Sequence, residues 1–356
     1  MKHYEKRLEQ DEQDIRAKTA AVAALVQEAL RNAVHATLTG NHKLASLTVL
    51  GDGEINRATR SIDRDCHLFI VRHLPSAGHL RLMSATIRAA IELERIGDYA
   101  VSIARVAARL SAPPDQRLAR TLENMAQESG EMLERAMQAF ADGNAEQART
   151  VTVMADQVER LRTAALDDLA HAAAERSTND LFGLFVLFSM LERVSDQAKN
   201  LCEEAIFAAT GETKASKVYR ILFLDSDNAI LAPMAEAIAR HHFPNSGSYE
   251  SASLSPAPAL DPEMLTFMSA RGIDLSAGSP VAFDKTPSEL AEYHVLISLQ
   301  GPIGKYVSDI PFHTTALEWD VAQSPDEATV EYEAVYRALS FQVRELMERL
   351  RGAEAD

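Results

Sequence analysis

The segments LERIGDYAVSIA (93–104) and LERVSDQAKNLC (191–202) repeat one pattern within the first 210 residues of the chain. Two further pairs occur in the same order: ATLTGN (36–41) with AFADGN (139–144), and GDGEINR (51–57) with ADQVERL (155–161). Self-similarity at a fixed period is the mark of a duplicated structural unit. These pairs therefore predict two copies of one helical unit, the first over residues 1–110 and the second over 111–210.

Helical spacing continues on both sides of the repeated segments. Apolar residues recur at intervals of three and four, and the only prolines before residue 210 are Pro75, Pro113 and Pro114. The pattern predicts six long helices, at residues 15–40, 43–73, 79–110, 115–142, 145–175 and 179–209. Long helices with short connections pack as antiparallel bundles, so we expect two three-helix bundles in tandem.

The pattern of apolar residues changes after a polar linker at residues 211–217. Strand-type runs occur at 218–224 and 294–299, and helical patterns at 233–242, 262–273, about 302–308 and 331–352. Alternating strands and helices are typical of a parallel-sheet α/β domain. We therefore predict a multidomain protein in which all-α bundles precede an α/β domain over residues 218–352.

The bulk composition excludes several classes of protein. The chain has 356 residues and a net charge of −16, from 36 basic and 52 acidic residues, which argues against nucleic-acid binding. The most apolar window, residues 181–191, is too short to span a membrane, and the N-terminal residues lack the pattern of a secretory signal. Two cysteines, Cys66 and Cys202, form no disulfide framework. These features predict a cytoplasmic protein with no membrane span.

Each repeat carries a pair of carboxylates four residues apart, Glu94 with Asp98 and Glu192 with Asp196. On a helix this spacing places both side chains on one face. That face also carries apolar residues: Leu80, Met83, Ile87 and Ile91 in the first repeat, and Leu181, Phe185 and Phe188 in the second. Acids on a bundle's apolar seam need a neutralising cation. We therefore predict oxygen-only metal sites that suit iron, manganese, magnesium or calcium.

The preceding helices could complete these sites. Asp52 and Asp156 are placed so that they could converge on the same groups. The alternative is that the pairs are solvated or bound to Arg95 and Arg193, which lie within the same motifs.

The duplicated unit with ELERIGDYAVSIA resembles the PhoU family of phosphate-signalling regulators over residues 10–209. The family has a Glu(Asp)-x-x-x-Asp motif in each repeat, and both motifs are intact here. The resemblance implies a cytoplasmic regulator of phosphate uptake and phosphate-starvation signalling, with clusters of iron, manganese or a similar metal on these carboxylates. It also implies contacts with the ATPase of the phosphate ABC transporter and with the phosphate-sensing histidine kinase. A homodimer, and attachment to the inner membrane through those partners, are compatible with it.

Residues 218–352 resemble the low-molecular-weight protein tyrosine phosphatases and arsenate reductases, through ILFLDSDNAILAPMAEA (221–237). In that family a strand leads into Cys-x5-Arg-Ser/Thr and a helix. Here the position of the nucleophilic Cys holds Asp225 and that of the anion-binding Arg holds Leu231, whereas Asn228 survives. The family's late acid loop corresponds to residues 319–325, where Gln323 and Ser324 replace the acid.

These replacements predict a catalytically dead domain. A thiolate is the nucleophile of the family's chemistry, and no cysteine follows Cys202. Asp225 and Asp227 would repel an anion at the start of the next helix. Two alternatives stay open: a phosphatase or arsenate reductase that uses unusual residues, including a phosphorylated aspartate, and a metal-free helical scaffold.

Overall fold

The structure is a computed structural model that describes residues 2–214, 217–319, 321 and 331–352. It divides into two compact units, Met1–Lys214 and Ala215–Asp356, and each unit is described here by itself.

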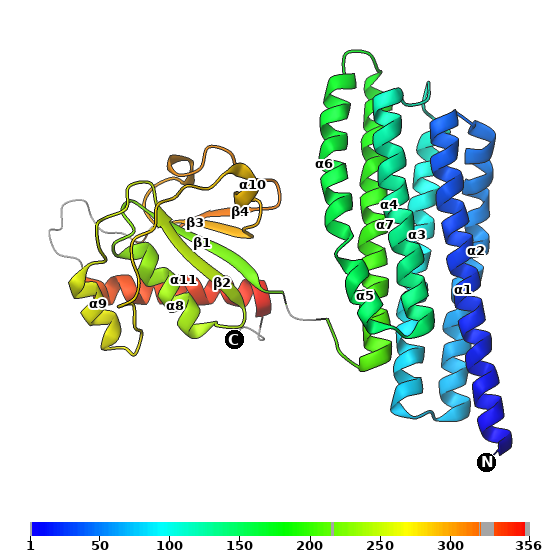
Figure 1. Ribbon diagram of the computed structural model, residues 1–356, viewed down its shortest axis with the longest axis horizontal. Helices are drawn as coiled ribbons and strands as arrows, with labels where there is room; N and C mark the ends of the chain where they lie inside the picture. The colour runs from blue at the N-terminus through cyan, green and yellow to red at the C-terminus, as the bar shows by residue number, and fades with distance from the viewer. Residues whose placement is uncertain (1, 215–216, 320, 322–330, 353–356) are drawn as a thin grey trace. The chain divides into compact units, whose positions relative to one another are not determined.

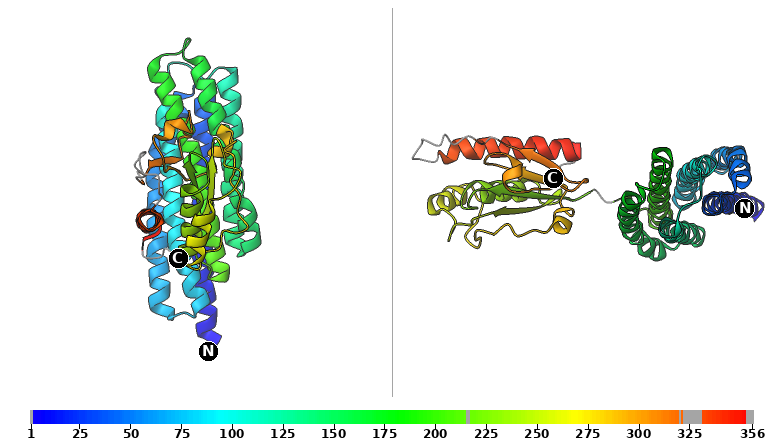
Figure 2. Two further views of the ribbon diagram at one scale, coloured as in Figure 1. Left: turned by 90° about the vertical axis from the view of Figure 1, so that its left-hand side faces the viewer. Right: turned by 90° about the horizontal axis from the view of Figure 1, so that it is seen from above.

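The first unit contains only helices among its described residues, as predicted (Figure 1). The first repeat comprises α1 (Lys2–Thr39), α2 (His42–His73) and α3 (Ala77–Ala107). The second comprises α4 (Gln116–Asp142), α5 (Ala145–Thr152), α6 (Ala155–Ala172) and α7 (Thr178–Thr210). Viewed end on, the long helices run side by side (Figure 2).

The prediction of one helix over residues 145–175 is wrong, because the chain turns at residues 153–154 between α5 and α6. Thr150, Val151, Thr152 and Val153 are four consecutive β-branched residues, whose side chains lose rotamer freedom in a helix. The hydroxyl of Thr152 donates to the carbonyl of Arg149 at 2.7 Å. The described part of the unit therefore has seven helices, and the second repeat differs from the first at this turn.

The repeated Gly-Asn pairs have the same structural role in both copies. Gly40 and Gly143 adopt left-handed φ angles of 65° and 62°, which glycine accommodates at the end of a helix. Asn41 then caps α2 by accepting the backbone N–H of Leu44 at 3.0 Å. Asn144 caps α5 in the same way, through Gln147 at 3.0 Å.

A single apolar core joins the two repeats. Helices α3 and α7 pack directly on each other, and each also packs on helices of its own repeat. Leu93 and Ile96 of α3 and Leu191 and Val194 of α7 are fully buried in this core. The signature segments thus lie at the centre of the first unit.

The second unit is a parallel four-stranded sheet in the order β2-β1-β3-β4, which confirms the predicted α/β class. Its strands are β1 (Tyr219–Asp225), β2 (Gly247–Ser253), β3 (Val295–Ser298) and β4 (Thr315–Glu318). Its helices are α8 (Leu231–His242), α9 (Pro262–Ser269), α10 (Pro287–Leu290), the 3-10 turn η1 (Ile303–Lys305) and α11 (Tyr332–Arg351).

Alternate residues of β1 enter two different cores, as the period of a strand requires. Ile221 and Phe223 pack with residues of α8, α9 and α11. Leu222 and Leu224 pack on the opposite face, with Tyr293. Both faces of the sheet are therefore covered, which is typical of parallel sheets.

The sequence pattern missed β2 and β4, and it overestimated the helix at about 302–308, which is only the single turn η1. Within the described ranges, no helix is both long and apolar enough to cross a membrane.

Candidate functional sites

In the first repeat, Asp98 of α3 faces Asp52 of α2. Partial burial raises the pKa of the Asp98 carboxyl and the charge of Asp52 raises it further, while Arg105 acts in the opposite direction. Gly97 makes this approach possible, since a Cβ there would lie 3.2 Å from the Ile55 side chain. The two carboxylates therefore repel each other across a close helix contact.

The same place contains oxygen atoms without partners. Asp52 accepts a hydrogen bond from the amide of Asn56 at 3.0 Å through Oδ2. Its Oδ1 atom and the Oδ1 atom of Asn56 are buried and make no hydrogen bond. Buried oxygens normally have a partner. Unpaired oxygens beside two repelling carboxylates fit a hard cation.

Glu94 lies one turn before Asp98 and is half-buried. Its neighbour Arg95 pairs instead with Glu92, at 3.1 Å. The expected apolar seam is wrong in part, because Leu80 and Ile91 on this face are each 44% exposed. Glu94 and Asp98 therefore border solvent.

The second repeat is organised differently. Glu192 of α7 is bound by Arg162 of α6, with 2.8 Å between Nε and Oε2. Burial raises the pKa of the Asp196 carboxyl, and the charge of Glu159 raises it further. The positive charges of Lys199 and Arg193 act in the opposite direction. A guanidinium thus already neutralises Glu192.

Asp156 is exposed and does not contribute to the shifted pKa of Asp196. The buried positions Ile55 and Val158 show why the sequence comparison misled. The separation between Ile55 and Val158 along the chain equals the separation between the two Gly-Asn pairs. In this register of the two repeats, Asn56 corresponds to Glu159 and Asp52 corresponds to Ala155. The pairing of Asp52 with Asp156 was therefore one residue out of register.

In the described part of the chain, no group of three or more His, Cys, Asp or Glu side chains is close enough to hold a metal. In the first repeat the protein could offer two carboxylates and one amide oxygen. Magnesium-like cations bind through one or two carboxylates and keep several waters, so this donor set fits them.

In the second unit, Asp225 ends β1 and is only 1% exposed. Its carboxylate accepts the backbone N–H groups of Asn228 at 2.6 Å and Ala232 at 2.8 Å. Burial raises the pKa of Asp225 to about 6, although these two hydrogen bonds favour the charged form. The carboxylate thus uses the N–H groups at the start of α8 that an external anion would need.

The other loop residues support this arrangement. Asp227 is exposed and accepts the N–H of Ala229 at 3.1 Å. Asn228 has a left-handed φ of 54°, and its side-chain oxygen accepts the N–H of Val281 at 2.8 Å. Leu231, which the sequence analysis aligned with the family's arginine, is buried in the apolar core on one face of the sheet.

Two polar residues outside this loop contact it: Gln300, which the family resemblance aligns with a further cysteine of the reductases, and Lys305, which sequence reasoning missed. Gln300 accepts the N–H of Ser226 at 3.0 Å, and the Lys305 ammonium lies 3.4 Å from the Ser226 hydroxyl. Both follow β3, and the carboxyl ends of neighbouring parallel strands meet at one edge of the sheet. That rule could have found Lys305 as well. Gln323 and Ser324 of the predicted late loop lie outside the described residues.

Neither cysteine is activated. Cys66 and Cys202 are free and fully buried. Burial raises the pKa of each thiol to about 12, so both are inert apolar groups at neutral pH.

Comparison with known proteins assigns the first unit. The PhoU domain family matches residues 20–107 and 122–205. The phosphate-specific transport system accessory protein PhoU of Edwardsiella tarda is 30% identical over 200 residues, which cover 56% of this chain and 82% of that protein. The crystal structure of PhoU from Pseudomonas aeruginosa covers 57% of this chain and 99% of its own, with 28% identity and a TM-score of 0.54.

The second unit is similar to SP-PTP, the low molecular weight protein tyrosine phosphatase from Streptococcus pyogenes. The match covers 38% of this chain and 96% of that one, with 15% identity and a TM-score of 0.34. Both repeats match the PhoU domain, and a relative is 30% identical over 82% of its own length. The chain therefore belongs to the PhoU family.

Proposed function

We propose that this protein regulates phosphate uptake and phosphate-starvation signalling by binding partner proteins. The observation that carries the proposal is the match of both repeats to the PhoU domain, together with relatives that are phosphate-specific transport system accessory proteins. The partners proposed are the ATPase of the phosphate ABC transporter and the phosphate-sensing histidine kinase. The cytoplasm is the proposed compartment, where the free cysteines would stay reduced.

A phosphate-regulon reporter in a deletion strain of the host tests this role. In high phosphate, we expect the reporter to be derepressed without the gene and repressed again when the full chain is supplied. A full chain with Asp225→Ala, supplied in parallel, measures the share of the second unit. A reporter that does not respond to deletion would refute the regulatory role.

We further propose that a hard divalent cation binds the first repeat between Asp52, Asn56 and Asp98, with Glu94 nearby. A cation would supply positive charge where two carboxylates repel each other and two buried oxygens lack partners. The second repeat would stay empty, because Arg162 already neutralises Glu192. Iron, manganese and magnesium are the candidates.

Metal analysis of the purified full chain separates the two repeats. We expect bound metal to fall in Asp52→Ala/Asp98→Ala and to stay unchanged in Glu192→Ala/Asp196→Ala. Glu192→Ala/Asp196→Ala removes the same two charges, and Asp156→Ala is a further control that removes one exposed acid. Equal metal in all four proteins would reject the site and favour a metal-free scaffold.

For the second unit we propose a binding domain without catalysis. The support is the Asp225 carboxylate, which takes up the two N–H groups of its own loop. The competing enzymatic function predicts hydrolysis of p-nitrophenyl phosphate that disappears in Asp225→Ala. We expect no hydrolysis from either protein, and activity lost only in the variant would reverse the assignment.

A further inference from the structure

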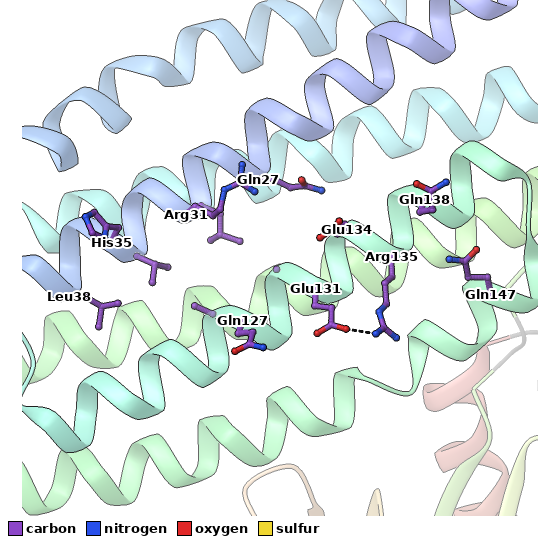
Figure 3. Close-up of a pocket in the computed structure, with 14 residues that line it drawn as sticks. Gln27, Arg31, His35, Leu38, Gln127, Glu131, Glu134, Arg135, Gln138 and Gln147 are labelled. Atoms are coloured by element: carbon purple, nitrogen blue, oxygen red, sulfur yellow. Dashed lines mark ion pairs between the residues drawn. The ribbon is translucent and has the colours of Figure 1, made fainter.

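A groove runs between α1 and α4 on the surface of the first unit. Figure 3 shows side chains of both helices projecting into it around a cavity of about 700 Å³. A second cavity of about 220 Å³ shares Gln27, Glu134 and Gln138 with the first. The two cavities extend along α1 from Arg16 to Leu38, which is about 33 Å of helix.

Small side chains keep the groove open. Ala20 and Ala24 of α1 border the narrower cavity, and Ala126 and Gly130 of α4 border the wider one. A Cβ built on Gly130 would meet no atom within 4 Å. The groove is therefore space that the two repeats leave unfilled where they meet.

The floor is apolar and the rim is polar. Leu30 and Val34 lie at the bottom and are 3% and 8% exposed, with half-buried Leu38 beside them. Glutamines and charged groups from both helices stand along the edges (Figure 3). An apolar floor with polar rims is the usual design of a groove that receives an amphipathic helix.

The rim charges define the chemistry of the occupant. Glu131 and Arg135 neutralise each other in an ion pair drawn in Figure 3. Arg31 on α1 and Glu134 on α4 make no ion pair among the residues that the structure describes. The groove thus presents one cation and one anion on opposite edges, which complement a helix that carries acidic residues on one flank and basic residues on the other.

The length and charge of the molecule argue against other occupants. A compact small molecule would fill the wider cavity alone, whereas the groove continues past it. The net charge of −16 disfavours a second copy of this chain and an anionic membrane, because like charges repel.

We propose that the α1–α4 groove binds one amphipathic helix of a partner protein. Its apolar stripe packs on Leu30, Val34 and Leu38, its acidic flank faces Arg31 and its basic flank faces Glu134. The inference rests on the proposed role in partner binding and identifies the surface that performs it.

The test is a fluorescence-anisotropy titration of the purified full chain with a labelled synthetic peptide. The peptide has about 18 residues, enough for a helix to form on binding, with a leucine stripe between a glutamate flank and a lysine flank. A scrambled peptide of the same composition destroys the stripe and is the control for the probe.

Matched variants identify the groove as the binding surface. Gly130→Trp fills the groove, and Gly130→Ala makes the same backbone change without filling it. Arg31→Glu removes the rim cation, and Arg60→Glu, at an exposed position of α2, makes the same change of net charge elsewhere. We expect Gly130→Trp to bind at least about tenfold more weakly and Arg31→Glu several-fold more weakly, with both controls unchanged.

Several results would overturn the proposal. They are no binding to the wild-type chain, equal binding of the scrambled peptide, and equal binding to Gly130→Trp. A change in self-association by Gly130→Trp in ultracentrifugation would assign the groove to a second copy, and groove-dependent binding to anionic vesicles would assign it to a membrane. The titration does not depend on the reporter strain. If the peptide binds in the groove while the reporter does not respond to deletion, the phosphate role is rejected and the groove remains a helix-binding site.

Discussion

Asp225 is a buried acid at the end of β1, and burial raises the pKa of its carboxyl to about 6. Its oxygens accept two backbone N–H groups in the loop and at the start of α8. The sequence singled out this residue. It could not show that the carboxylate turns inward, because that depends on the three-dimensional path of the loop.

We predict that Asp225 makes the stability of the second unit depend on pH. Its folded pKa of about 6 exceeds the ordinary value of 3.8, so its favourable contribution is complete below the ordinary value and is lost as pH rises through 6. A pKa shift of this size changes the free energy of unfolding by roughly 3 kcal/mol at most. Urea unfolding followed by the fluorescence of Trp319 measures it, since this is the chain's single tryptophan.

Asp225→Asn should remove this part of the pH dependence, because the amide does not titrate. The exposed Asp227→Asn is the matched control and should keep the wild-type slope between about pH 4 and about pH 7. Identical slopes in wild type and Asp225→Asn would show that Asp225 does not carry the effect.

At the level of elements, the contact between α2 and α3 depends on Gly97. A side chain larger than alanine would collide with Ile55, whose methyl groups lie 3.2 and 3.3 Å from a Cβ at this position. We predict that Gly97→Leu destabilises the first unit by about 1–3 kcal/mol. Thermal unfolding monitored by far-UV circular dichroism gives the value.

The double variant Gly97→Leu/Ile55→Ala provides the control. It should recover part of the lost stability, because the second change makes room for the new side chain. If the double variant loses the sum of the free energies of unfolding that the two single changes cost, Gly97 and Ile55 do not determine how closely α2 and α3 pack.

The helix termini support a second prediction at this scale. Asn41→Ala and Asn144→Ala should each reduce the free energy of unfolding by about 1 kcal/mol, because each removes the side-chain acceptor that caps a helix. Asn41→Ser and Asn144→Ser keep a side-chain acceptor and should retain most of the stability that the alanine variants lose. Denaturant unfolding measures both pairs, and equal stability of alanine and serine variants would contradict the capping role.

Periodicity predicted the long helices and the class of the second unit because these features depend on local patterning. It missed β2, whose sequence GSYESAS has the composition of a loop and becomes a strand only by pairing with β1 along its whole length. There a tertiary contact overrode a weak local preference. The sequence also paired Asp156 with Asp52, one residue away from the register that the Gly-Asn pairs share with the buried Ile55 and Val158.

At the scale of the whole molecule, the chain consists of two compact units whose unfolding can be followed separately. The helices of the first unit dominate far-UV circular dichroism, whereas Trp319 reports on the second. The change in sequence texture after residue 210 anticipated this division, because duplicated helical patterns end where strand patterns begin. The asymmetry between the two repeats could not be anticipated, since the ion pair between Arg162 and Glu192 joins separate helices.

This division allows the proposed cation to be assigned to one place in the molecule. We predict that Mg²⁺ or Mn²⁺ raises the melting temperature of the helical unit and leaves the Trp319 transition unchanged. A cation at about 100 times its Kd stabilises the folded state by about 2.7 kcal/mol. The effect should strengthen as pH rises, because burial and Asp52 raise the pKa of Asp98, which must lose its proton before it binds metal. Asp98→Asn should abolish the response, whereas the exposed Asp156→Asn should keep it. A response that moves both transitions, or that survives Asp98→Asn, would place the cation elsewhere.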